Sequence, residues 1–139
     1  MITKDDIVPE STARLLFKKG FDEPCFFWYN SIHILVSPSF IGGMCNSNST
    51  FKENIDLYEE DCCPVSAPTF QEVERWFRDT HHIDICVCGE LNEYGKCFDS
   101  YIAVVYQNGC HKATIRDTEG NLTYEEASNK AIEYGLTLI

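Results

Sequence analysis

The sequence predicts an α+β fold, with an antiparallel sheet of three to five strands and helices packed on one face. Three observations predict it: two helix patterns that each open with a capping box, a run of alternating apolar and polar residues, and an Asn-Gly pair typical of a tight hairpin. In the C-terminal half these elements follow the order α-β-β-β-α. The 139 residues suit a single domain over 1–139, long enough to bury a core without a metal or disulfide.

The first half contains a helix pattern, a strand-rich run and a long irregular segment. Residues 8–20 predict a helix, with Pro9 in the first turn and Gly20 at the left-handed position after the last turn. Residues 25–37 are rich in aromatic and β-branched side chains, which predicts one or two strands with a turn at Asn30-Ser31. Residues 38–66 are expected to be a functional or mobile loop, with room for a short strand near residues 55–58.

The second half begins with a second predicted helix, over residues 70–80. Thr69 and Glu72 have the spacing of a capping box. An apolar stripe follows at helical spacing, made of Phe70, Val73, Trp76 and Phe77. Residues 83–88 alternate apolar and polar side chains and predict a half-buried strand. A turn at 92–95 then leads into a longer strand at 98–107.

Asn108-Gly109 predicts a two-residue hairpin turn, because a type I′ turn needs positive φ at both central positions. A regular register after this turn pairs Val104 with Ala113 and Ile102 with Ile115. We therefore expect these four residues to form the buried face of the sheet. Thr123 and Glu126 form another capping-box pair, before a last helix at 124–136. The residues expected to pack this helix on the sheet are Ala127, Ala131, Tyr134 and Leu138.

The charge argues against nucleic-acid binding. The chain has 22 acidic and 11 basic residues, a formal net charge of −11. Most of the affinity for nucleic acid comes from basic groups that neutralise phosphates. The order α-β-β-β-α is that of the double-stranded-RNA-binding domain, but such domains carry lysines at the start of the second helix. Here that position reads Tyr124-Glu125-Glu126, so no nucleic-acid partner is expected.

Eight cysteines are many for a chain with no export signal at its N-terminus. None of them has C-x-x-C spacing, so most are interpreted as buried free thiols. The best metal hypothesis is a structural or regulatory zinc site that uses Cys86, Cys88 and His82. Cys86 and Cys88 share one face of a strand, and we expect residues 25–37 to cover that face. The adjacent pair His81-His82 is more typical of a helix end than of a chelate.

Three segments resemble a group of uncharacterised small proteins encoded by bacteriophages and mobile elements of gut Bacteroidales and their relatives. The segments are ITKDDIVPESTARLLFKKGFDEPC near the start, SAPTFQEVERWFRDTHHIDICV in the middle and TYEEASNKAIEYGLTLI at the end. Together they cover about half of the chain. The resemblance implies a bacterial or phage origin and a cytoplasmic setting, and it implies no reaction.

The function expected from the sequence is that of a non-enzymatic accessory or protein-interaction protein. Two surfaces are predicted to bind a protein partner: the aromatic run Phe27, Trp28 and Tyr29, and the acidic residues Glu59, Glu60 and Asp61. A homodimer is left open. No apolar run is long enough to cross a membrane, and no cofactor or catalytic residue is expected. A zinc-binding protein is the first alternative and a cysteine-dependent enzyme the second.

Overall fold

The computed structural model describes residues 2–36, 63–91, 97–117 and 120–139, with the side chains of residue 91 and residues 97–99 left out of the description. The chain divides into two compact units, residues 1–69 and 70–139. Each unit contains helices and a three-stranded antiparallel sheet, so the predicted α+β class is confirmed. The expectation of a single domain stays a prediction.

In its described residues, unit 1 combines the helix α1 with a sheet of very short strands. Its elements are the 3-10 helix η1 (Lys4–Asp6), α1 (Glu10–Lys18), β1 (Trp28–Tyr29), β2 (Leu35–Val36) and β3 (Val65–Ser66). β1 lies at the centre of the sheet and pairs antiparallel with both β2 and β3. The two strands expected within residues 25–37 are therefore present. The strand β3 was not expected from the sequence.

Helix α1 ends in the way that Gly20 predicts. Gly20 has a φ of +89°, and its N–H donates to the carbonyl of Phe17 at 3.1 Å. The N–H of Phe21 donates to the carbonyl of Leu16 at 2.9 Å, which completes a Schellman motif. The helix is shorter than the predicted range 8–20, because Pro9 precedes it and Lys19 ends it. Its buried side chains belong to a core made up chiefly of Val8, Thr12, Ala13, Leu16, Phe21, Cys25, Cys63 and Val65.

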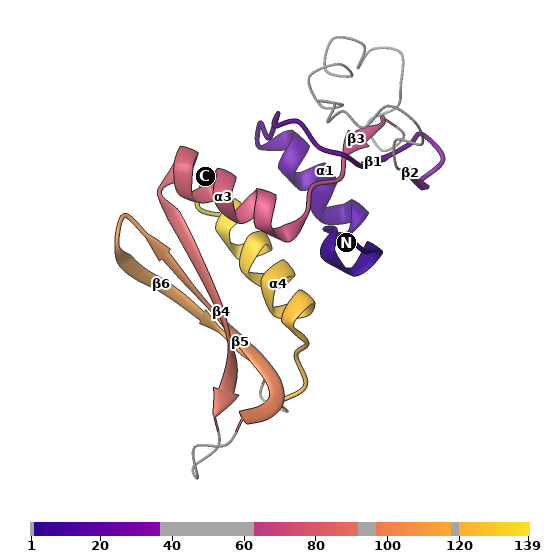
Figure 1. Cartoon of the computed structure of the whole chain (residues 1–139). Coiled ribbons are helices and arrows are strands. Elements are labelled where there is room, and N and C mark those ends of the chain that lie inside the picture. The colour runs from indigo at the N-terminus through magenta and orange to yellow at the C-terminus, as the bar shows by residue number, and fades with distance from the viewer. Residues whose placement is uncertain (1, 37–62, 92–96, 118–119) are drawn as a thin grey trace. The chain divides into compact units, whose positions relative to one another are not determined.

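Unit 2 has the predicted α-β-β-β-α order (Figure 1). Its elements are α3 (Phe70–His81), β4 (Ile83–Leu91), β5 (Cys97–Gln107), β6 (Cys110–Ile115) and α4 (Tyr124–Leu136). The strands form an antiparallel sheet in the order β4-β5-β6. Figure 1 shows α3 and α4 together on one side of this sheet. The predicted stripe of α3 is fully confirmed, since Phe70, Val73, Trp76 and Phe77 are all buried.

The predicted register of the β5–β6 hairpin is wrong beyond its first two pairs. Asn108 and Gly109 have φ values of +50° and +77°, and Gln107 pairs with Cys110, as the Asn-Gly turn requires. A bulge at Lys112 then shifts the register by one residue, so Ala113 pairs with Val105 and Ile115 with Ala103.

Because of the bulge, the residues of β5 that lie on the helix-covered face differ from those predicted. Ala103 and Val105 are completely buried, whereas Ile102 and Val104 are only half-buried and lie on the opposite face. The expected inner face was therefore correct for Ala113 and Ile115 and wrong for Ile102 and Val104. When the register of a hairpin is predicted without its bulge, the residues of one strand are placed on the wrong face of the sheet.

Helix α4 starts at the predicted residue but packs through a somewhat different stripe. The Thr123 side chain accepts a hydrogen bond from the Glu126 N–H at 3.1 Å, so its capping box is present. Ala127 and Ala131 are buried as expected, but Tyr134 and Leu138 are half-buried. The other buried residues of the helix are Ser128, Ile132, Gly135 and Leu136.

The two helices of unit 2 approach closely at Gly135. A Cβ atom built on Gly135 would lie 3.0 Å from the ring of Phe77. Since glycine has no side chain there, α3 and α4 can approach in the way that was expected from their apolar stripes. Within the described residues, no helix combines the length and apolar character needed to cross a membrane.

Candidate functional site

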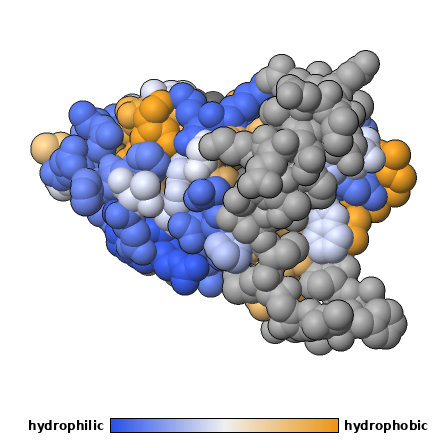
Figure 2. Space-filling model, turned by 90° about the horizontal axis from the view of Figure 1, so that it is seen from above, coloured by the Kyte–Doolittle hydropathy of each residue, from blue (hydrophilic) through white to orange (hydrophobic). Residues whose placement is uncertain are grey.

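The most exposed large apolar side chains of the described residues lie in the turn between β1 and β2. Ile32 is 67% exposed and Ile34 is 53% exposed. We call residues 30–34 the isoleucine turn. Figure 2 shows apolar residues at the surface on the right-hand edge of the view, the side on which this turn lies in Figure 1. Two exposed isoleucines close together on one turn make this turn a candidate binding surface.

Asn30 holds the isoleucine turn in one conformation. Its side-chain oxygen accepts hydrogen bonds from the N–H groups of Ile32 at 3.1 Å and Ile34 at 2.9 Å. Its own N–H donates to the carbonyl of Ile34 at 3.0 Å, and the N–H of His33 donates to the carbonyl of Asn30 at 3.0 Å. This side-chain-to-backbone pattern explains why Asn is favoured where a chain reverses. The sequence prediction of a turn at Asn30 is thus confirmed.

His33 lies at the tip of the turn in the left-handed backbone region, with a φ of +65°. That conformation is uncommon for a residue with a side chain and has an energetic cost. The His33 imidazole is anchored to helix α1, because its Nδ1 lies 2.5 Å from Glu10 Oε1. The anchor and the Asn30 hydrogen bonds together keep the two isoleucines presented to solvent.

Glu10 is in turn fixed by Arg14. Arg14 donates from Nε at 3.1 Å and from a terminal nitrogen at 2.8 Å to the same Glu10 oxygen. The other terminal nitrogen of Arg14 donates to the carbonyl of Cys63 at 2.8 Å. These contacts connect α1, the isoleucine turn and the chain entering β3.

The same contacts perturb the titration of nearby groups. Burial raises the pKa of Glu10, but hydrogen bonds from His33 and Arg14 outweigh burial and bring the pKa below its ordinary value. Burial raises the pKa of Tyr29, and the Glu10 charge adds to that effect. Burial also raises the pKa of the Cys63 thiol, against the opposing charge of Arg14. Cys63 is consequently a thiol in its neutral form rather than a nucleophilic thiolate.

The aromatic residues predicted to bind a partner have mainly structural positions. Phe27, Trp28 and Tyr29 are half-buried, and the last two form β1, the central strand. The Tyr29 hydroxyl donates to the Val8 carbonyl at 2.9 Å. The exposed apolar side chains instead follow this run by a few residues. The sequence contained a signal for them, since the alternation Ile32, His33, Ile34 begins two residues after the turn-forming Asn30.

The acidic residues Glu59, Glu60 and Asp61 lie outside the described residues, as do residues 38–62 of the predicted loop, the suggested strand at 55–58 within it, and the turn at 92–95. Their predicted roles stay predictions. Of the eight cysteines, Cys25 and Cys63 are buried, whereas Cys86, Cys88 and Cys110 are free and exposed. The expectation of mostly buried thiols is therefore correct for two of these five.

Of the three residues in the zinc hypothesis, two lie on β4 and the third, His82, immediately precedes that strand. Cys86 and Cys88 share one face of β4, and both are exposed. The cover expected from residues 25–37, which belong to the other unit, stays a prediction. His82 precedes β4, about 13 Å from Cys86 by strand rise over four residues. Among the described residues, no group of three or more His, Cys, Asp and Glu side chains is placed to hold a metal ion.

The histidine pair forms the end of α3, as predicted. His81 is the last helical residue, and its ring lies 4.6 Å from that of Trp76 in an edge-to-face contact. Burial lowers the pKa of His81, and the neighbouring His82 lowers it further. His82 has a φ of +55°, the left-handed conformation that ends many helices, and its carbonyl accepts a hydrogen bond from the Asn108 N–H at 2.9 Å.

Comparisons with protein-family models, with curated proteins and with solved structures returned no match to this chain.

Proposed function

We propose that this chain is a non-enzymatic protein-interaction protein that binds its partner through the isoleucine turn. One observation carries the proposal: Ile32 and Ile34 are exposed by 67% and 53% on a turn that is held in place by hydrogen bonds. Burial of such a side chain contributes roughly 1.5–3 kcal/mol, and a rigid turn loses little conformational entropy on binding. The partner surface is an apolar groove.

Charge favours a basic partner. The net charge of −11 attracts basic proteins at long range and speeds their association. The proposed complex therefore joins the two isoleucines to an apolar groove with basic residues around it. Its affinity is expected to fall as salt concentration rises, because long-range attraction is screened.

The setting follows from the resemblance and from the thiols. The three segments that resemble phage and mobile-element proteins support a role as an accessory protein of such an element. Five free cysteines among the described residues are typical of a reducing compartment, which supports the cytoplasm. The alternative is a homodimer, in which a second copy of the chain provides the apolar groove. The experiment below distinguishes self-association from the binding of a different protein.

The test compares the wild type with Ile32→Ser/Ile34→Ser and with Leu15→Ser, a variant at another exposed apolar residue of unit 1. Tagged proteins are incubated with an extract of bacteria of the group that the resemblance indicates. The protein retained by the wild type is then purified, and its affinity is measured by calorimetry at two salt concentrations. Sedimentation of each variant alone detects self-association.

The proposal predicts that Leu15→Ser binds as the wild type does, whereas the double variant binds at least about 100-fold more weakly, a value typical of two binding hot spots. All three proteins should unfold at the same urea concentration, because the changed side chains are exposed. Equal affinity of the wild type and the double variant for the purified partner would contradict the proposal.

A further inference from the structure

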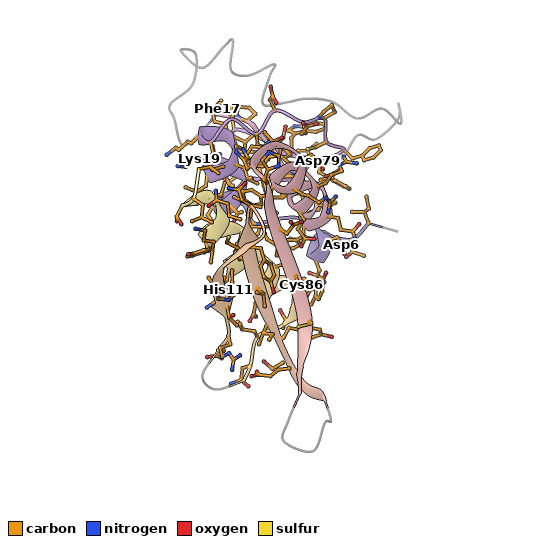
Figure 3. The ribbon with its side chains drawn as sticks, turned by 90° about the vertical axis from the view of Figure 1, so that its left-hand side faces the viewer. Asp6, Phe17, Lys19, Asp79, Cys86 and His111 are labelled. Atoms are coloured by element: carbon orange, nitrogen blue, oxygen red, sulfur yellow. The ribbon has the colours of Figure 1, made fainter. Side chains whose placement is uncertain are left out.

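The face of the β4-β5-β6 sheet opposite the helices carries two thiols side by side. We call it the outer face and define it by Asp84, Cys86, Cys88, Ile102, Val104, Tyr106, His111 and Thr114. Figure 3 shows this face toward the viewer, with Cys86 on β4 and His111 on β6. Cys86 and Cys88 alternate with Ile85 and Val87, which point to the helices.

The neighbours of the two thiols are apolar. Val104 lies directly across from Cys86 on β5, and Ile102 lies across from Cys88. Both aliphatic residues are half-buried, whereas both cysteines are exposed and are free thiols. The outer face therefore presents two accessible sulfur atoms beside an apolar strip on a rigid strand.

Strand geometry disfavours a disulfide between them. Two residues of strand rise place the Cα atoms about 6.6 Å apart, and side chains on one face are parallel, so the Cβ atoms are about as far apart. A disulfide needs Cβ atoms about 3.8 Å apart. Closing the bond would bend β4 in the middle of its ladder with β5. The geometry of β4 therefore disfavours a disulfide between these two thiols.

An ion between the sulfurs fits the same spacing well. With metal–sulfur bonds of about 2.3 Å, two sulfurs in line through an ion lie about 4.6 Å apart. Each sulfur has to lean inward by only about 1 Å from the strand spacing of about 6.6 Å. Rotation about the Cα–Cβ bond is sufficient for such a shift, since exposed side chains change rotamer freely.

We propose that Cys86 and Cys88 bind one soft, two-coordinate metal ion, with Cu(I) as the fitting class. Soft thiolate ligands select Cu(I), zinc and iron–sulfur clusters, but structural zinc and these clusters need about four ligands, which leaves Cu(I) as the ion that fits two. On binding, each thiol loses its proton, two metal–sulfur bonds form, and two protons leave to solvent for each ion. No electron is transferred. This site goes beyond the proposed partner binding and does not depend on it.

The test is a titration of the reduced protein with Cu(I) without oxygen, in competition with a coloured Cu(I) chelator. The variants are Cys86→Ser, Cys88→Ser, the double variant, and Cys110→Ser as the control, since Cys110 is also exposed. Circular dichroism and urea unfolding check that each variant folds. Proton release is followed with a pH indicator.

The proposal predicts one tight Cu(I) site in the wild type and in Cys110→Ser that the double variant lacks. Binding of Cu(I) at this site should release two protons. Each single variant should bind that ion at least about 100-fold more weakly, because a second tethered ligand raises affinity by about 10² or more. Equal Cu(I) stoichiometry and affinity in the wild type and the double variant would overturn it. So would a single variant that keeps the wild-type affinity.

Discussion

Glu10 shows how one carboxylate supports the candidate binding surface. Its oxygen is shared by His33 from the isoleucine turn and by Arg14 from α1. Without that oxygen, the turn would lose the contact that holds His33 in its left-handed conformation. The residue is therefore expected to matter for binding through its effect on the conformation of the isoleucine turn.

The first prediction concerns the pH dependence that Glu10 contributes. Folding lowers the pKa of Glu10 below its ordinary value of 4.5, because the hydrogen bonds outweigh burial. A carboxyl of this kind stabilises the fold above its unfolded pKa, and the contribution disappears as pH falls through the lower folded pKa. Urea unfolding between about pH 6 and about pH 3 should show a steeper loss of stability for the wild type than for Glu10→Gln.

Glu23→Gln is the control for this measurement, since Glu23 is an exposed carboxyl of the same unit. Its unfolding free energy should follow the wild-type curve. Parallel curves for the wild type and Glu10→Gln below pH 4.5 would show that the anchor is absent in solution.

The second prediction concerns the reactivity of single thiols. A short pulse of iodoacetamide should label Cys86, Cys88 and Cys110, which are exposed, well before Cys25 and Cys63, which are buried. Burial also raises the pKa of Cys63 and so lowers its thiolate fraction. Peptide mass spectrometry reports the label at each site. Labelling of Cys63 as fast as that of Cys86 would be inconsistent with the described core.

At the scale of elements, the bulge at Lys112 decides which residues line the inner face of the sheet. With the bulge, His111 pairs with Tyr106 and Ala113 with Val105, so Lys112 has no partner on β5. Deletion of Lys112 removes the bulge and leaves every pair in place. In a hairpin without a bulge, the same deletion would move Ala113 and Ile115 to the other face.

The third prediction follows directly. Deletion of Lys112 should change the free energy of unfolding by at most about 1 kcal/mol, the scale of an ordinary surface change. Deletion of Thr114 is the matched control, because it does move Ile115 off the inner face, and it should cost several times more. Both values come from urea unfolding. A loss for the Lys112 deletion as large as that for the Thr114 deletion would refute the described register.

The elements that could be predicted are those with strong local signals. The ends of α4, the stripe of α3 and the Asn-Gly turn each follow from residues close together in the chain. The bulge could not be predicted, because the Asn-Gly turn fixes only the pairs next to it and not the register farther along the strands. The strand β3 escaped prediction because its two residues pair with β1, far away in sequence.

The candidate site proposed here differs from the surfaces that the sequence suggested, which stay predictions. Aromatic residues were chosen for their type, yet Trp28 and Tyr29 serve as the central strand of a sheet. Exposure depends on which side of a short strand faces the core, and strands of two residues give too few alternations to decide this. The turn at Asn30 could be predicted from the sequence. The exposure of the neighbouring isoleucines could not, because it depends on the three-dimensional structure of the turn.

At the scale of the whole molecule, the two proposed activities lie in different units. The isoleucine turn belongs to residues 1–69, and the thiol pair belongs to residues 70–139. Each is built from contacts within its own unit. The proposals can therefore fail separately.

The fourth prediction uses this separation. Ile32→Ser/Ile34→Ser should weaken partner binding and leave the tight Cu(I) site intact, whereas Cys86→Ser/Cys88→Ser should do the reverse. The two measurements are the calorimetric affinity and the Cu(I) stoichiometry of the same preparations. A variant that abolished both would point to a global loss of structure, which urea unfolding would detect.

The most direct test of the central claim places a photo-crosslinking benzophenone side chain at position 32. Position 15 in the same unit and position 124 in the other, both occupied by exposed apolar residues, serve as controls. On illumination in a cell extract, the chain modified at 32 should form one discrete adduct with a basic protein, and the controls should not. Adducts at 15 or 124 with none at 32 would contradict the assignment of the isoleucine turn as the binding surface.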